Sequence, residues 1–265
     1  MSVDLSPLWI SLHTAAATIA VVFFLGVLAA WWVENLHSEG AKILVDGIFT
    51  LPMVLPPTVA GFFLLVIFGN NRAVGSFFRE VLGIQIAFSW LATVLAAAVI
   101  AFPLMYRSAR GALAQVDKGI MEAGRSLGMT EWRIFWRLHL PCAFPGIISG
   151  GLLAFARGLG EFGATAMLAG NIAGKTRTLP LAVYSAVAAG DWDSASVYVA
   201  IIVVICLAVV IGLNVYQCQC KHRWLSRGAW VDMTTVCCQE QHSSKQEREQ
   251  KTHAKHHAEH KIHRR

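Results

Sequence analysis

Two opposite charges stand inside a long apolar, glycine-rich stretch of this sequence, residues 143–169. Arg157 and Glu161 lie four positions apart, so a helix would place them on one face, where they can form an ion pair. Because a lone charge in lipid costs about 2.5 to 3.5 kcal/mol or more, we expect the two side chains to pair or to face the protein interior. Two interpretations stay open: Arg157 helps an anion along a path, or the pair locks two helices together.

A second stretch has the spacing of a phosphate-binding loop. Residues 169–176 read AGNIAGKT and satisfy the loose form of a P-loop, whose backbone amides would hold nucleotide phosphates. A working P-loop follows a strand and opens a helix, whereas this stretch follows an apolar segment and precedes Pro180. We therefore interpret it as a chance match and predict that this chain does not itself hydrolyse ATP.

The C-terminal stretch 218–265 is rich in histidine and cysteine, which can bind zinc. The candidate ligands are His253, His256, His257 and His260. The cysteines and histidines are not set out with zinc-finger spacing in a compact module, and the residues from Gln239 onward are polar and poor in apolar side chains. We expect a disordered, basic, solvated tail without a metal site, and metal binding by the histidines is the alternative.

The composition indicates which elements must position these residues. Hydrophobic residues make up 55% of the chain and charged residues 14%, against about 25% charged in a soluble domain, which excludes an ordinary soluble globular protein. Hydrocarbon about 30 Å thick needs about 20 apolar helical residues. We predict an all-α, polytopic membrane protein with about five spans, at residues 14–33, 47–68, 88–106, 143–169 and 195–216. Pro52, Pro56 and Pro57 should kink or break the second span.

The positions of Lys and Arg predict the orientation of the chain. Most of the net charge of +6 belongs to residues 218–265, so the basic pI does not indicate a nucleic-acid partner. Basic residues favour the cytoplasmic side of a membrane, and six of them gather between the third and fourth spans: Arg107, Arg110, Lys118, Arg125, Arg133 and Arg137. With five spans, the N-terminus is then outside, and this segment and the tail are cytoplasmic.

Residues 114–141, between those two spans, predict two short helices. The first carries one apolar stripe: Val116, Ile120, Ala123 and Leu127. Gly128 supplies the left-handed position that ends a helix, and Thr130 can cap a second helix that Pro141 stops. The second helix carries a bulky face: Trp132, Phe135, Trp136 and His139. This pair of helices is either a docking surface for another protein or an amphipathic hairpin in the lipid headgroup region.

The same segment resembles a known family motif. Glu122-Ala123-Gly124, three residues, Gly128, nine residues and Leu138-His139-Leu140-Pro141 resemble the EAA loop of binding-protein-dependent ABC importer permeases. Gly124 stands where the family pattern has Ala, and Leu138 stands where it has Ile. The resemblance covers about residues 8–217. It implies that the loop forms coupling helices in a groove of a cytoplasmic ATPase subunit, with Glu122 and Gly128 ordering the turn.

Three further stretches resemble the molybdate, tungstate and sulfate branch of this family. Residues 156–165 (ARGLGEFGAT) look like the A-R-x-x-G-E-F-G segment of that branch. Residues 171–180 (NIAGKTRTLP) and 51–59 (LPMVLPPTV) are most similar to the corresponding runs of molybdate permeases. The substrate assignment depends on this resemblance, because composition does not distinguish molybdate from sulfate.

The resemblance implies a permease domain over residues 1–217 in a cell's inner membrane, followed by the tail. It implies a homodimer, two copies of a separate ATPase subunit that uses ATP, and a periplasmic molybdate-binding protein. The chain itself would catalyse no reaction and bind no cofactor, and its other contact would be membrane lipid. The coupling residues would be Glu122, Ala123, Gly124, Gly128, Leu138, Leu140 and Pro141.

Two alternatives remain at this stage. The nearer one is the same machine with sulfate, thiosulfate or tungstate as cargo. The other is a membrane-anchored sensor that uses the helix-glycine-helix segment to bind DNA and the histidine-rich tail to bind metal. Spans at both ends of that segment leave it little room to reach a major groove, which favours the permease.

Overall fold

A computed structural model describes the backbone of residues 4–226, and the side chains of that range except residues 73, 213 and 216–226. All regular secondary structure among the described residues is helical and none of it is strand, which confirms the all-α fold class. Its helices are α1 (Ser6–Glu34), α2 (Glu39–Val54), α3 (Pro57–Phe68), α4 (Ala73–Leu82), α5 (Trp90–Ala114), α6 (Lys118–Ser126), α7 (Glu131–Ile134), a π-helical turn η1 (Phe135–His139), α8 (Leu140–Leu159), α9 (Gly163–Leu168), α10 (Leu179–Ala188) and α11 (Trp192–Ser226).

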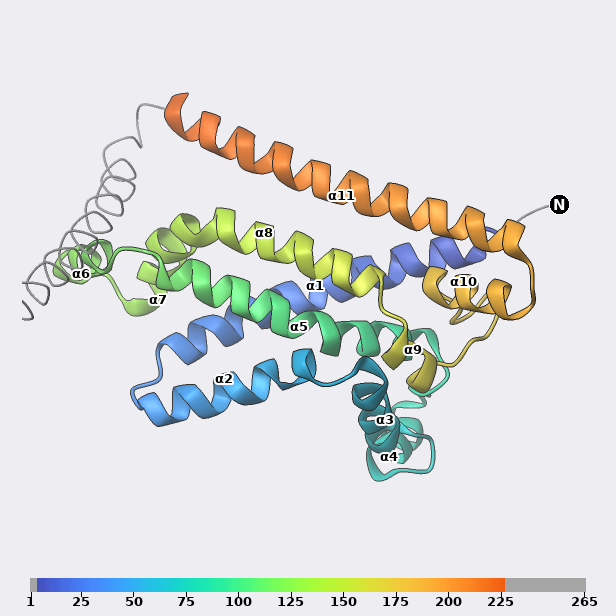
Figure 1. Cartoon of the computed structure of the whole chain (residues 1–265). Coiled ribbons are helices and arrows are strands. Elements are labelled where there is room, and N and C mark those ends of the chain that lie inside the picture. The colour runs from blue at the N-terminus through green and yellow to red at the C-terminus, as the bar shows by residue number, and fades with distance from the viewer. Residues whose placement is uncertain (1–3, 227–265) are drawn as a thin grey trace, which may run out of the picture.

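The helices α1, α5 and α8 form the centre of the bundle, and α11 lies along its outside (Figure 1). Small residues let these helices approach closely, as is usual where lipid offers no hydrophobic driving force between helices. A Cβ on Gly146 would come within 2.7 Å of the Ala112 Cβ, and a Cβ on Gly150 would overlap the Ser108 side chain. The glycines of α8 therefore decide how closely α8 packs on α5.

Two polar contacts show which helix ends lie together. The Trp90 Nε1 donates to Thr14 Oγ1 at 3.1 Å, and the Tyr198 hydroxyl donates to the Asp4 carbonyl at 2.9 Å. The helices α1, α5 and α11 therefore all start at one end, called here the N-terminal end, where α9 and α10 also lie (Figure 1). The opposite end carries α6 and α7 and is called the loop end.

Four helices among the described residues are long and apolar enough to span a membrane, and a bent pair makes up to five. The bent pair is α2 and α3, which meet at 109°. The break falls at Pro56 and Pro57, as the prolines predict, whereas Pro52 is accommodated inside α2. Pro57 opens α3, where its missing N–H leaves no hydrogen bond unmade.

The predicted range 143–169 is not one continuous helix. The helix α8 ends at Leu159, and the separate short helix α9 begins at Gly163. A Cβ on Gly163 would lie 3.1 Å from the Thr58 backbone nitrogen, and a Cβ on Gly61 would lie 2.6 Å from the Ala164 Cα. The α8–α9 break therefore packs directly against the α2–α3 break.

Candidate functional site

The turn after α6 has the geometry that its glycine predicts. Gly128 has a φ of +73°, a left-handed conformation that glycine adopts without a Cβ clash. The Gly128 N–H donates to the Arg125 carbonyl at 2.9 Å, and the Met129 N–H donates to the Gly124 carbonyl at 3.1 Å. These two bonds form a Schellman motif, which satisfies the last carbonyls of the helix and reverses the chain.

An ion pair braces this turn from outside. The Arg125 Nε donates to Glu131 Oε1 at 2.6 Å, and the Arg125 Nη2 donates to Glu131 Oε2 at 3.2 Å, so α6 and α7 are joined across Gly128. The hydrogen bonds and charge of Glu131 raise the pKa of the Arg125 guanidinium. Both side chains are exposed, so the pair orders the turn without burying a charge.

The two positions that depart from the family pattern lie against each other. Gly124 is buried, and a Cβ there would come within 2.9 Å of Leu138 Cδ1 and 3.2 Å of Ile134 Cγ1. The glycine makes room for the leucine that faces it. Because each change fits the other, the departures preserve the contact between α6 and η1.

The outer surface of α6 consists of Glu122, Ala123 and the residues that lead into the turn. Leu127 lies at the tip with 81% of its surface exposed. The predicted apolar stripe does not form the buried side of α6, which passes through Gly124 instead. Glu122, Ala123, Leu127 and Gly128 thus form one open edge at the loop end.

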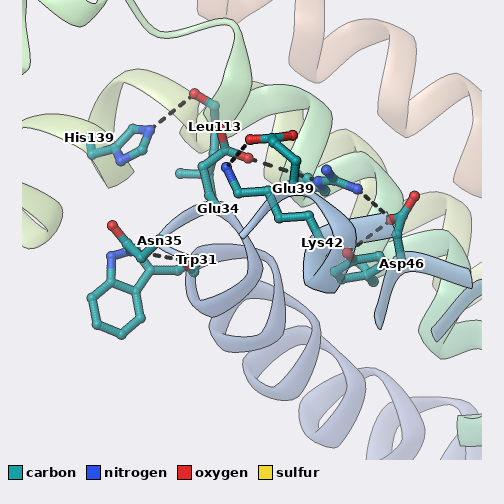
Figure 2. Close-up of polar contacts among 10 residues, drawn as sticks. Trp31, Glu34, Asn35, Glu39, Lys42, Asp46, Leu113 and His139 are labelled. Carbon is teal, nitrogen blue, oxygen red and sulfur yellow. Dashed lines mark hydrogen bonds and ion pairs between the residues drawn. The ribbon is translucent and has the colours of Figure 1, made fainter. Parts of the chain in front are cut away.

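The second half of the segment packs on the bundle. Phe135 and His139 are buried, and the His139 Nε2 donates to the Leu113 carbonyl at 3.0 Å, at the end of α5 (Figure 2). Of the predicted bulky face, two residues therefore face inward, while Trp132 and Trp136 are exposed. The segment is not a free helix but the docked beginning of α8.

Pro141 does not stop the second helix, contrary to the prediction. The chain continues from α7 through η1 into α8, and Pro141 lies in the first turn of α8. The π-helical turn at Phe135–His139 shifts the backbone pairing just before the proline, so its missing N–H is accommodated. Leu140 and Pro141 accordingly link the loop rigidly to a membrane helix.

A charged cluster at the loop end was not anticipated. Arg110 on α5 is ion-paired with Asp46 on α2 at 2.5 Å and with Glu34 at the end of α1 at 3.9 Å, and the buried Tyr106 donates to Asp46 at 3.0 Å (Figure 2). The predicted place of Arg110 is the segment between the third and fourth spans, whereas it lies within α5. The acidic residue next to the second apolar stretch was the available signal.

Arg157 and Glu161 form the ion pair that the sequence predicts, at 3.0 Å between Nη1 and Oε2. The expectation that the two residues share a helix face is wrong, since Glu161 lies past the end of α8. The Glu161 Oε1 accepts the Ala164 backbone N–H at 2.9 Å, at the start of α9. Glu161 is 2% exposed, so it joins the two pieces of the broken segment from inside the protein.

The stretch 169–176 is preceded by the helix α9 and forms a turn, not the strand-to-helix junction of a P-loop. The Thr176 hydroxyl accepts the Ile172 N–H at 3.0 Å and is buried. Lys175, at the tip of the turn, is exposed. The candidate metal ligands His253, His256, His257 and His260 lie outside the described residues.

Known proteins are similar to this chain in sequence and in fold. The family model described as the binding-protein-dependent transport system inner membrane component matches residues 15–217. The molybdenum transport system permease protein ModB of Escherichia coli (strain K12) is 44% identical over 200 residues, covering 74% of this chain and 87% of its own length. ModB of Haemophilus influenzae (strain Rd) is 41% identical over 182 residues, covering 69% and 79%.

Among solved structures, a chain of the inward-facing MetNI methionine ABC transporter superposes with a TM-score of 0.65 at 17% identity, covering 82% of this chain and 98% of that one. That likeness shows the fold. The sequence match covers the bundle, the Gly128 turn and both helix breaks together, so these features belong to one architecture. The chain is therefore a member of the binding-protein-dependent transport system inner membrane component family, a multi-pass transport permease of the inner membrane.

Proposed function

We propose that this chain is the permease subunit that carries molybdate across the inner membrane in an ATP-driven importer. The observation that supports molybdate as the substrate is the sequence identity of 41% to 44% with permeases named for molybdenum transport. The chain would bind no cofactor, and a separate ATPase subunit would hydrolyse ATP. The transport role of the chain follows from its family, and we propose in addition that the transported anion is molybdate.

The open edge at the loop end is the proposed site of ATPase coupling. Glu122, Ala123 and Gly128 are exposed on it, and the Arg125–Glu131 pair orders the turn from the side. Behind the edge, Gly124 packs on Leu138, and Leu140 and Pro141 continue into α8. A displacement of the edge is therefore transmitted to a membrane helix through packed contacts rather than through a flexible linker.

The junction of the two helix breaks is the proposed path element. Glu161 is held from two sides, by Arg157 and by the N–H of Ala164, which supports a structural role for it. The Arg157 side chain is 42% exposed, so the protein does not enclose it as it encloses Glu161. We assign Arg157 to the path and Glu161 to holding it in place.

The proposed assembly is a homodimer with two copies of the ATPase at the loop end and a periplasmic molybdate-binding protein at the N-terminal end. The apolar side chains of α2 and α3 support the dimer, because Ile48 and Val54 on α2 and Phe62 on α3 are exposed in the single chain. In this orientation the N-terminus is outside and the tail is cytoplasmic.

Uptake by reconstituted vesicles tests the proposed cargo. Vesicles would contain this chain with an ATPase subunit and an oxyanion-binding protein from the same organism. We expect ATP-dependent accumulation of molybdate, with sulfate and thiosulfate competing weakly and tungstate competing well because its size and charge match. Uptake that prefers sulfate over molybdate would instead assign the chain to sulfate transport.

A further inference from the structure

The tryptophans whose side chains the structure describes fall at the two ends of the bundle. Trp9, Trp90 and Trp192 lie at the starts of α1, α5 and α11, at the N-terminal end. The loop end holds the others: Trp31, Trp32, Trp132 and Trp136. The middle of these helices is aliphatic or phenylalanine-rich, so the tryptophans mark two levels.

The distance between the two levels matches a bilayer. From Trp9 to Trp31 the chain is one uninterrupted helix, and at a rise of about 1.5 Å per residue this stretch is about 33 Å long. The hydrocarbon core of a membrane is about 30 Å thick. Tryptophan collects at both membrane–water interfaces, where its ring is apolar and its N–H is hydrated. The two levels therefore indicate the two headgroup layers.

The loop-end level includes part of the loop itself. The Trp31 ring lies 5.8 Å from the Trp132 ring and 5.1 Å from the Phe135 ring, and Trp132 lies 5.7 Å from Trp136. Trp132 and Trp136 keep 55% and 48% of their surface exposed. These contacts hold residues 131–139 at the height of Trp31, the end of a membrane span.

The exposed tryptophans lie near the end of an exposed apolar row of α1. Along α1, exposed apolar side chains recur at helical spacing and end at Trp32: Val21, Phe24, Leu25, Leu28 and Trp32. Trp31, the neighbour of that last residue, contacts Trp132. Arg133 and Arg137 are exposed beside the tryptophans, and cations at this depth attract anionic headgroups.

We propose that the exposed face of residues 131–139, formed by Trp132, Trp136, Arg133 and Arg137, binds anionic lipid headgroups and not a protein partner. The segment between α5 and α8 is then divided in two. Its second half lies in the headgroup layer and sets the height of the loop, and the α6 edge around Leu127 projects into water. Because residues 131–139 continue into α8, a tilt of α8 would change their contact with the lipid.

Site-specific photo-crosslinking in proteoliposomes of phosphatidylethanolamine and phosphatidylglycerol tests the proposal. The photoreactive residue p-benzoylphenylalanine would replace Trp136, an aromatic exchange, and in separate variants Leu127 and Phe24. Phe24 is an exposed residue in the middle of α1 and serves as the lipid-facing reference. We expect the crosslinker at position 136 to form about tenfold more lipid adduct than at position 127, and a yield near that of position 24.

Adding the ATPase subunit distinguishes the lipid contact at position 136 from the protein contact at position 127. The crosslinker at position 127 should then form a protein adduct, and the yield of lipid adduct at position 136 should stay unchanged. An ATPase adduct from position 136, or a lipid yield there no higher than at position 127, would overturn the proposal. Only the ATPase arm rests on the proposed function: failure at position 127 alone would count against that function and leave the lipid contact standing.

The charge of the lipid supplies a second readout. Replacing Arg133 and Arg137 together by glutamine should lower the phosphatidylglycerol share of the adduct at position 136 by about fivefold or more, from the attraction of each basic side chain near an anionic surface. The phosphatidylethanolamine adduct should persist. An unchanged lipid ratio would overturn the part of the proposal that concerns anionic headgroups.

Discussion

The chain bridges two helix breaks with the same kind of ion pair, and the two pairs differ in burial. Arg125 and Glu131 meet across the Gly128 turn with 54% and 59% of their side chains exposed. Arg157 and Glu161 meet across the α8–α9 break, where the Glu161 side chain is 1% exposed. Exposed pairs contribute little to stability and are screened by salt, whereas a buried carboxylate depends on its partners. We therefore call the Gly128 turn the adjustable break, because water can replace its ion pair. We call the α8–α9 break the fixed break, because its buried carboxylate depends on its partners.

The largest expected effect is on the adjustable break. Gly128→Asp should abolish molybdate uptake while the protein stays in the membrane, because a side chain at φ +73° is strained by about 1 to 2 kcal/mol and adds charge to the proposed coupling edge. Replacing Glu122 together with Gly128 should do the same. Uptake by vesicles and the amount of membrane-inserted chain are the measurements.

Gly190→Asp is the matched control for that loss. Gly190 has a φ of +76° and open space around its missing Cβ, as Gly128 has, but it lies between α10 and α11. The strain is therefore equal while the location differs, and uptake should be largely kept. Normal uptake by a membrane-inserted Gly128→Asp variant would contradict the assignment of the Gly128 turn to ATPase coupling.

At the fixed break, we expect a loss of stability. Glu161→Gln removes the charge that Arg157 faces and weakens the acceptor for the Ala164 N–H. The expected cost is about 2 kcal/mol, below the value for fully buried pairs because Arg157 is partly exposed. Thermal unfolding of the purified chain in lipid nanodiscs measures it. A double replacement, Arg157→Gln with Glu161→Gln, should recover part of the loss, and failure to recover would argue against a paired charge.

The contact behind the adjustable break predicts a smaller effect. Gly124→Ala would place a Cβ within 2.9 Å of Leu138 Cδ1 and should destabilise the chain by about 1 kcal/mol through overpacking. Adding Leu138→Ile, which restores the pair found in the family pattern, should recover about half of it. Unfolding of the two single variants and the double variant measures the coupling, and strictly additive changes would show that the two departures are unrelated.

The smallest effect is expected for the exposed pair itself. Glu131→Gln should shift the melting temperature less than Glu161→Gln does, because water already solvates both charges of the Arg125–Glu131 pair. The remaining difference from the unmodified chain should vanish at about 1 M salt, where charges are screened over about 3 Å. A shift as large as that of Glu161→Gln would erase the distinction between the two breaks.

Local chemistry explains which features could be predicted from the sequence. The break at Pro56 and the left-handed Gly128 follow from the covalent structure of single residues, so no tertiary information is needed. Apolar length gave the helical, membrane-spanning class. The end of α8 at Leu159 and the passage of the chain through Pro141 could not be predicted, since both depend on contacts with other helices.

The sequence by itself determined the class of fold, the positions of the breaks with a proline or a helix-ending glycine, and the presence of an Arg157–Glu161 pair, because these depend on hydrophobic length, backbone sterics and the high energy of a lone charge in lipid. Only the tertiary structure decided that Glu161 accepts the Ala164 N–H at the start of α9, that Gly124 faces Leu138, and that Arg110 joins Asp46 and Glu34. The first contact depends on where α8 ends, and the other two join residues whose proximity comes from the packing of helices, which local sequence does not encode.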